Sequence, residues 1–282
     1  MRGFPKLTRG AEGDPGLFGP ASLAWRINAE SILLMGGGRA LLMQVAHPMV
    51  AAGVADHSDF TVAPFDRLWR TVDTALTVIF GDSSQWRSAV ERVHRVHDTV
   101  YGERHGVRYS ALDPELLLWV HATLVDSSIE AYARLVRPMP LVVRERYYLE
   151  MRRMGTAFGV PEELHPATYL DFRGYLARTI STLQIGDECR AVARRVLTPP
   201  APLVLWPAGI ASGLLSVGLL PPPVRRELGL RWNGGTERAF SAAAAVVRST
   251  LPLLPDRVRR WPHAREAERR VRRNRPSRFG EA

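Results

Sequence analysis

The sequence predicts an all-α fold, a single helical domain built from consecutive amphipathic helices. Between residues 64 and 81, apolar side chains recur at the three- and four-residue spacing of one helix face. Asp113, Pro114 and Glu115 together form a typical helix start: a capping side chain, a proline at the first helical position and an acid near the positive end of the helix dipole. No stretch shows the sustained alternation of apolar and polar residues that is typical of a strand.

The N-terminal third begins with a turn-rich lead-in over residues 10–20. Ser22 is expected to cap a helix over 24–35, and an apolar helical region follows the three glycines at 36–38. These glycines permit either the close approach of another backbone or a positive φ. They do not belong to a phosphate-binding loop, because neither the GxGxxG pattern nor a GK[ST] ending is present.

Further helices are expected along the rest of the chain. Residues 201–224 carry no charged side chain, but prolines leave only about 13 continuous residues between breakers, so we interpret the segment as a core helix or an interfacial segment rather than a membrane span. After a turn, one more helix precedes the C-terminal tail. The other expected helices cover residues 64–80, 85–101, 113–136, 141–158 and 166–184.

The predicted organisation is a lead-in (1–20), a helical domain (21–255) and a basic C-terminal helix or tail (256–282). Ten arginines and two glutamates lie between Arg257 and Arg278, so this stretch carries +8 of the net charge of +10. Such a run is usually a solvated helix or a frayed end. The alternative is an acidic partner, either a membrane surface or a nucleic acid.

The only cysteine, Cys189, has no partner for an internal disulfide, and the first ten residues lack the apolar core of a secretory signal. A cytoplasmic protein is expected.

Several histidines are candidate metal ligands. His94 and His97 share a helix face, so both could bind one metal, or one could face a pocket while the other is solvated. His121 lies among leucines on an apolar face, where a buried histidine bonded to a carbonyl or to Asp126 is the simpler interpretation. Taken alone, the HxxH pattern is weak.

Other polar residues leave similar alternatives open. His47 precedes Pro48 at an expected helix break, and His57 fits a capped turn. Arg67, Arg70 and Thr71 form a polar strip at helical spacing, which either faces solvent or holds a carboxylate of the protein or of a cofactor. The last two histidines, at 165 and 263, are assigned to a loop and to the tail.

Five segments in order give the chain a family resemblance: GGGRALLMQVAHPMVAAGVADHSDF, RLWRT, HDTVYG, YSALDPELLLWVHATLVDS and RERYYLEM. Over roughly residues 14–250 the chain resembles the MpaB-type oxygenases, which are related to latex clearing protein, the rubber oxygenase. The resemblance implies an all-α fold with globin-like helix packing around haem b.

The resemblance also implies roles for individual residues. His97 with Val100 matches the HxxV pattern of the proximal iron ligand. Arg67, Arg70 and Thr71 match the basic-xx-basic-Thr motif of the distal side. Arginine at position 70 is a departure, because a guanidinium does not readily deprotonate or bind iron, although it can donate a hydrogen bond to O2.

By the same resemblance, His121 lies where the rubber enzymes line the pocket with a small polar residue. It is therefore expected to act as a pocket acid or base, or as the second iron ligand. His57 is a further catalytic candidate, and His47 and His94 are candidates for contact with the cofactor.

The expected function is that of a haem b-dependent oxygenase, in particular a dioxygenase, acting with O2 on an apolar substrate that contains an alkene or a prenyl group. No specific nucleic acid is expected as a partner. Weak peripheral contact with a membrane, through the basic tail and the apolar segment 201–224, is a further expectation.

Two other functions fit parts of the sequence. His57, His97, Asp98 and Asp126 could form the H…HD…D set of a metal-dependent phosphohydrolase. Alternatively, the helical domain is a scaffold without catalytic activity, and the basic tail binds nucleic acid or an anionic membrane.

Overall fold

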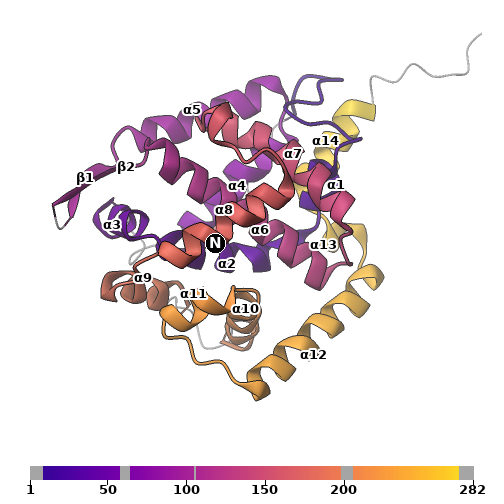
Figure 1. Ribbon diagram of the computed structural model, residues 1–282. Coiled ribbons are helices and arrows are strands. Elements are labelled where there is room, and N and C mark those ends of the chain that lie inside the picture. Colours follow the sequence, from indigo (N-terminus) through magenta and orange to yellow (C-terminus); the bar gives the residue numbers. More distant parts are fainter. Residues whose placement is uncertain (1–8, 58–63, 105, 198–205, 273–282) are drawn as a thin grey trace, which may run out of the picture.

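The computed structural model describes residues 9–57, 64–104, 106–197 and 206–272. These residues form a bundle of helices with one small hairpin, so the all-α prediction is confirmed (Figure 1). No described helix is both long enough and apolar enough to cross a bilayer.

The N-terminal part of the chain consists of short helices. Ser22 caps the first of them, as predicted, by accepting a hydrogen bond from the Trp25 amide. The helix expected over 24–35 is divided, however, and the glycines at 36–38 lie inside a later helix rather than before it. The elements are α1 (Leu23–Asn28), the 3-10 helix η1 (Ser31–Leu33), α2 (Leu34–Val45) and α3 (Pro48–His57).

Two long helices and a hairpin follow. The capping box of Asp82 and Gln85 starts the second helix, which ends at His97 and not at 101 as expected. The chain then turns back through an antiparallel hairpin that the sequence analysis missed, with Gly106 at a positive φ of 76° in the turn. The elements are α4 (Pro64–Phe80), α5 (Ser83–His97), β1 (Tyr101–Arg104) and β2 (Val107–Ser110).

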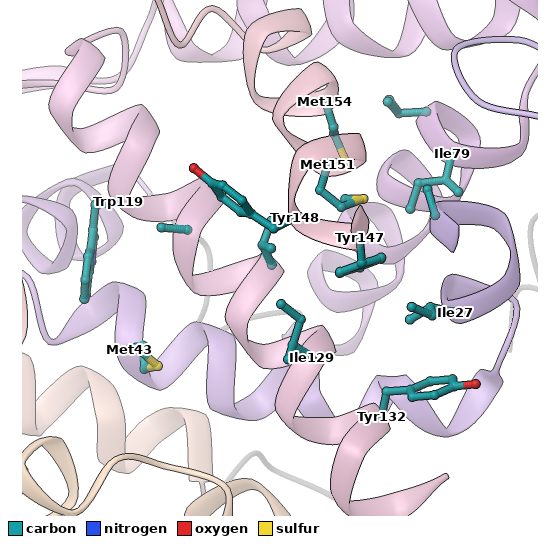
Figure 2. Close-up of a cluster of buried hydrophobic side chains, with 14 of the residues drawn as sticks. Ile27, Met43, Ile79, Trp119, Ile129, Tyr132, Tyr147, Tyr148, Met151 and Met154 are labelled. Carbon is teal, nitrogen blue, oxygen red and sulfur yellow. The ribbon is translucent and has the colours of Figure 1, made fainter. Parts of the chain in front are cut away.

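The central helix α6 runs from Pro114 to Leu135. Its predicted start is confirmed, because the Asp113 side chain accepts hydrogen bonds from the amides of Glu115 and Leu116. Most of its side chains are buried, and helices α1, α2, α7 and α12 pack around it. Figure 2 shows apolar side chains of these surrounding helices, such as Ile27, Met43 and Met151, gathered beside it.

The remaining elements complete the bundle. The helix over Asp187–Leu197 was not predicted, and part of the apolar segment 201–224 lies outside the described residues. The elements are α7 (Leu141–Ala157), η2 (Glu162–Leu164), α8 (Tyr169–Thr182), α9 (Asp187–Leu197), α10 (Trp206–Gly218), α11 (Pro222–Glu227), α12 (Gly234–Thr250), η4 (Leu251–Leu253), α13 (Asp256–Arg259) and α14 (Pro262–Arg272).

The glycines of α2 allow close helix packing, and none of them has a positive φ, so the first of the two roles that the sequence left open is the one observed. A Cβ built on Gly36 would lie 3.0 Å from both the Ala131 Cβ and the Ser127 carbonyl oxygen of α6. A Cβ on Gly38 would collide with the Ser216 side chain of α10. The glycines therefore bring α2 against α6 on one side and α10 on another.

The basic tail is only partly solvated, which corrects the expectation of a solvated or frayed end. On α14, His263, Ala264, Ala267 and Arg270 are buried. His263 Nε2 lies 3.0 Å from Asp73 Oδ1 of α4, and Arg270 donates to the carbonyl oxygens of Asp14 and Phe80. One face of this helix therefore belongs to the core, which charge counting could not show.

A buried ion pair joins the central helices. Arg39 of α2 binds Asp126 of α6 and also donates to Ser127 Oγ at 2.7 Å and to the Leu219 carbonyl at 2.8 Å. The other oxygen of Asp126 accepts from Arg173 of α8 at 2.6 Å. Both partners of the central pair are almost fully buried.

We predict that Asp126→Asn destabilises the protein by about 3–5 kcal/mol, because it leaves Arg39 buried without a counter-charge. Asp187→Asn is the matched control. Its side chain is 97% exposed and pairs with Arg190, so its loss is expected to cost less than about 1 kcal/mol. Urea unfolding of both variants measures the difference, and equal effects would contradict the importance of the buried pair.

Candidate functional site

Each of four candidate histidines has one buried ring nitrogen that lacks a hydrogen-bond partner within the described part of the chain. These atoms are His47 Nδ1, His94 Nε2, His97 Nδ1 and His121 Nε2. Buried polar atoms are nearly always paired in folded proteins, so unpaired imidazole nitrogens require an explanation.

Two of these histidines approach the first half of α6. The ring of His47, between α2 and α3, lies 6.4 Å from the ring of Trp119. A Cβ built on Gly159, just after α7, would lie 3.6 Å from Leu117 Cδ1 and 3.8 Å from His94 Nε2. His47 and His94 therefore reach the same helix from different elements.

His97 is the last residue of α5 and is partly buried. Burial lowers its pKa below the ordinary value of 6.5, the nearby charge of His94 acts in the same direction, and Asp98 opposes them. The imidazole is therefore neutral at pH 7, as metal binding requires. Val100, the other residue of the HxxV pattern, lies beside α3: a Cβ on Gly53 would be 3.6 Å from Val100 Cγ1.

His121 faces α7 and a second histidine that the sequence analysis had assigned to a loop. A Cβ on Gly155 would lie 2.5 Å from His165 Cε1 and 2.9 Å from His121 Nε2. Both rings therefore pack against the glycine, in space that a side chain at position 155 would occupy. Their centroids are 5.8 Å apart with the rings edge to face. Burial, reinforced by His165, lowers the pKa of His121 to about 3, which keeps the ring neutral.

His165 is held in this position by its neighbours. Its Nε2 lies 3.3 Å from Thr156 Oγ1, and that hydroxyl donates to Glu162, which pairs with Arg152. The sequence carried no periodic signal for His165, because it follows a short 3-10 turn. The only hint was Gly155, one of two glycines near the end of a helix.

His57, a predicted catalytic residue, is exposed at the end of α3. Its Nε2 lies 3.0 Å from the Tyr101 carbonyl oxygen of the hairpin. The preceding Asp56 binds Arg104 and accepts from the Tyr109 hydroxyl at 2.5 Å. Hydrogen bonds from these two partners lower the pKa of Asp56 to about 2. These contacts hold the hairpin against α3. The proposed catalytic role of His57 stays a prediction.

The predicted distal motif lies in the first half of α4. Arg70 and Thr71 are exposed, and the side chain of Arg67 lies outside the described residues. Two residues after Thr71, Asp73 binds His263, so α14 anchors the helix that carries the motif. The structure records no contact between Arg70 and the buried histidines.

The H…HD…D set of a phosphohydrolase is not assembled. Both carboxylate oxygens of Asp126 are taken by Arg39 and Arg173, and His57 contacts the hairpin instead. Among the described residues, no group of three or more His, Cys, Asp or Glu side chains is placed to hold a metal ion.

The buried histidines do suit haem. Haem would need only one firm ligand from the protein, so a single neutral imidazole with a free nitrogen would be enough to hold it. His97 offers such an imidazole, and His47 and His94 bring further free nitrogens toward α6.

Similarity to known proteins identifies the family of the chain. Residues 25–249 match the family described as "ER-bound oxygenase mpaB/B'/Rubber oxygenase, catalytic domain". Two relatives, uncharacterized protein Mb2261 of Mycobacterium bovis and uncharacterized protein Rv2237 of Mycobacterium tuberculosis, are each 30% identical over 231 residues, which cover 77% of this chain and 88% of the relative. No solved structure matches the chain. The chain therefore belongs to the mpaB/rubber oxygenase family of catalytic domains, a family of oxidoreductases.

Proposed function

We propose that the protein is a haem b-dependent oxygenase, in particular a dioxygenase, that uses O2 to oxidise a small apolar substrate containing an alkene or prenyl group. The observation that carries the proposal is His97, a neutral and partly buried imidazole with a free ring nitrogen, followed by Val100 in the HxxV pattern. Family membership supports the oxygenase class.

In this proposal His97 holds the iron, and His47 and His94 contact the cofactor. Bound there, haem supplies a redox-active iron that activates O2 toward a carbon–carbon double bond. Arg70 and Thr71, together with Arg67, donate hydrogen bonds on the distal side. Since the first two are exposed in the structure, they reach a reacting group only if α4 or the substrate closes over them.

His121 is better suited to proton transfer or to shaping the pocket than to binding iron. Its free Nε2 faces Gly155 and His165, not the end of α5. Its neutral ring at pH 7 can accept or donate a hydrogen bond without a buried charge. Its role as second iron ligand remains the alternative.

Membrane contact is a subsidiary proposal. An apolar substrate would be enriched in a lipid phase, and exposed arginines of the C-terminal region favour an anionic surface. Since one face of α14 is packed against α4, only the outer face of this helix is available for such contact. No feature points to a specific nucleic acid.

The proposed function predicts that the protein binds haem. The purified protein is expected to show a Soret band and about one iron per chain in a pyridine haemochrome assay. His97→Ala is expected to lose the haem because it removes the axial ligand, whereas His121→Ala retains it but changes activity. If His121→Ala alone lost the haem, the two roles would be exchanged. A chain without haem, even after haem is supplied during expression and in vitro, would refute the proposal.

The proposed function also predicts that Arg70 contributes to the reaction with O2. Arg70→Gln is expected to keep the haem content and lower the rate of O2 consumption with an alkene substrate by about 10–100-fold, the effect of losing a charge-assisted hydrogen bond of about 1.5–3 kcal/mol. Arg87→Gln is the control, since Arg87 is also exposed but stacks on Trp86 of α5. Equal rates in both variants would remove Arg70 from the mechanism.

A further inference from the structure

Three described arginines are more than nine-tenths buried, and two of them donate hydrogen bonds from their side chains. Arg39, 1% exposed, binds Asp126. Arg270, 4% exposed, donates from Nε and NH2 to the carbonyl oxygens of Asp14 and Phe80 and leaves only its NH1 unpaired. The third, Arg225 of α11, is 8% exposed. Among the described residues, its side chain has neither an ion pair nor a hydrogen bond.

The recorded contact of the Arg225 side chain is with an aromatic ring. Its Cζ lies 4.3 Å from the centroid of the Trp232 ring. A cation over an indole is stabilised through the face of the guanidinium, but the N–H donors in its plane gain nothing from this contact. Its terminal nitrogen NH1 is buried and unpaired.

Nearby charged side chains do not supply the missing partner of the buried Arg225 guanidinium. Glu237 is close enough to act on Arg225, but its carboxylate accepts a hydrogen bond from Trp232 Nε1 at 2.8 Å and does not pair with the arginine. Arg226, the next residue, is exposed, and its positive charge acts against the charge of Arg225. A guanidinium does not escape this penalty by deprotonation, because it stays charged even when burial lowers its pKa.

The position in the fold leaves the stack accessible. Trp232 is only partly buried and lies in the loop between α11 and α12, which runs along the edge of the bundle (Figure 1). The indole also packs edge to face on Phe240 of α12, with ring centroids 6.1 Å apart. The arginine and tryptophan therefore lie just beneath the surface, next to the apolar side chains between α10 and α12.

We propose that Arg225 and Trp232 form a binding site for a small oxyanion, a carboxylate or a phosphate group. The fork of guanidinium N–H donors matches two oxygens of such a group, and the indole provides a wall for an apolar part of the same ligand. Because NH1 is buried and unpaired, the oxyanion enters in the plane of the guanidinium, beside the Trp232 ring, after a small local shift. The site is independent of the haem proposal and uses none of its residues.

The test is thermal unfolding of the full chain in Tris chloride, with phosphate, acetate or additional chloride at one ionic strength. A ligand that binds only the native state raises the Tm, so phosphate or acetate is expected to raise it by about 2–4 °C at several times its Kd, and chloride is not. A response to phosphate alone assigns a phosphate ligand, and a response to acetate alone assigns a carboxylate.

Two variants locate the response. Arg225→Leu is expected to abolish it and to be no less stable than the parent chain without oxyanions, because it removes an unpaired buried charge. Arg226→Leu, next to it but exposed, is expected to keep the response. A parent chain that ignores both oxyanions, or an Arg225→Leu variant that responds as strongly as the parent, would overturn the proposal.

Tryptophan fluorescence provides a measurement that does not depend on the folding of Arg225→Leu. Titration of the parent chain with the active oxyanion is expected to change the emission, because the anion binds beside the Trp232 ring and alters its surroundings. Trp232→Phe is expected to remove that change. An identical change in Trp232→Phe would place the anion at another site and contradict the proposal.

Discussion

The buried ion pair between Arg39 and Asp126 connects the helices that position the candidate site. It links α2 to the central helix α6, and its further bonds reach Arg173 of α8 and the end of α10. Such a pair needs further hydrogen bonds, and here each nitrogen of the Arg39 guanidinium donates one, while both oxygens of Asp126 accept one. The ion pair fixes the orientation of α2 on α6. It thereby also fixes the position of His47, which follows α2.

Glycines and buried charges act together in this arrangement. Gly36 lets the backbones of α2 and α6 approach, and the close approach in turn keeps Arg39 out of water. At the other end of the site, Gly155 and Gly159 let His121, His165 and His94 rest against the end of α7. Small residues at helix crossings thus decide which polar side chains become buried, and burial in turn keeps His97 and His121 neutral.

The C-terminal part of the chain shows how poorly charge alone predicts structure. Arg269 and Arg272 of α14 are exposed, whereas His263 and Arg270 fasten the helix to α4 and to the lead-in segment. Arg225 presents the opposite case, since it is buried without a counter-charge. A count of arginines gives the net charge, but it does not distinguish structural arginines, solvated arginines and arginines available to a ligand.

The sequence by itself determined the helical class, the caps at Ser22 and Asp113, and the family, because these depend on local propensity, spacing and motif order. Only the tertiary structure decided that His121 faces His165, that Asp126 is occupied by two arginines, and that a hairpin follows His97. These features depend on contacts between residues far apart in the chain. No local pattern encodes which distant side chain supplies a partner, and a four-residue strand is too short to show periodicity.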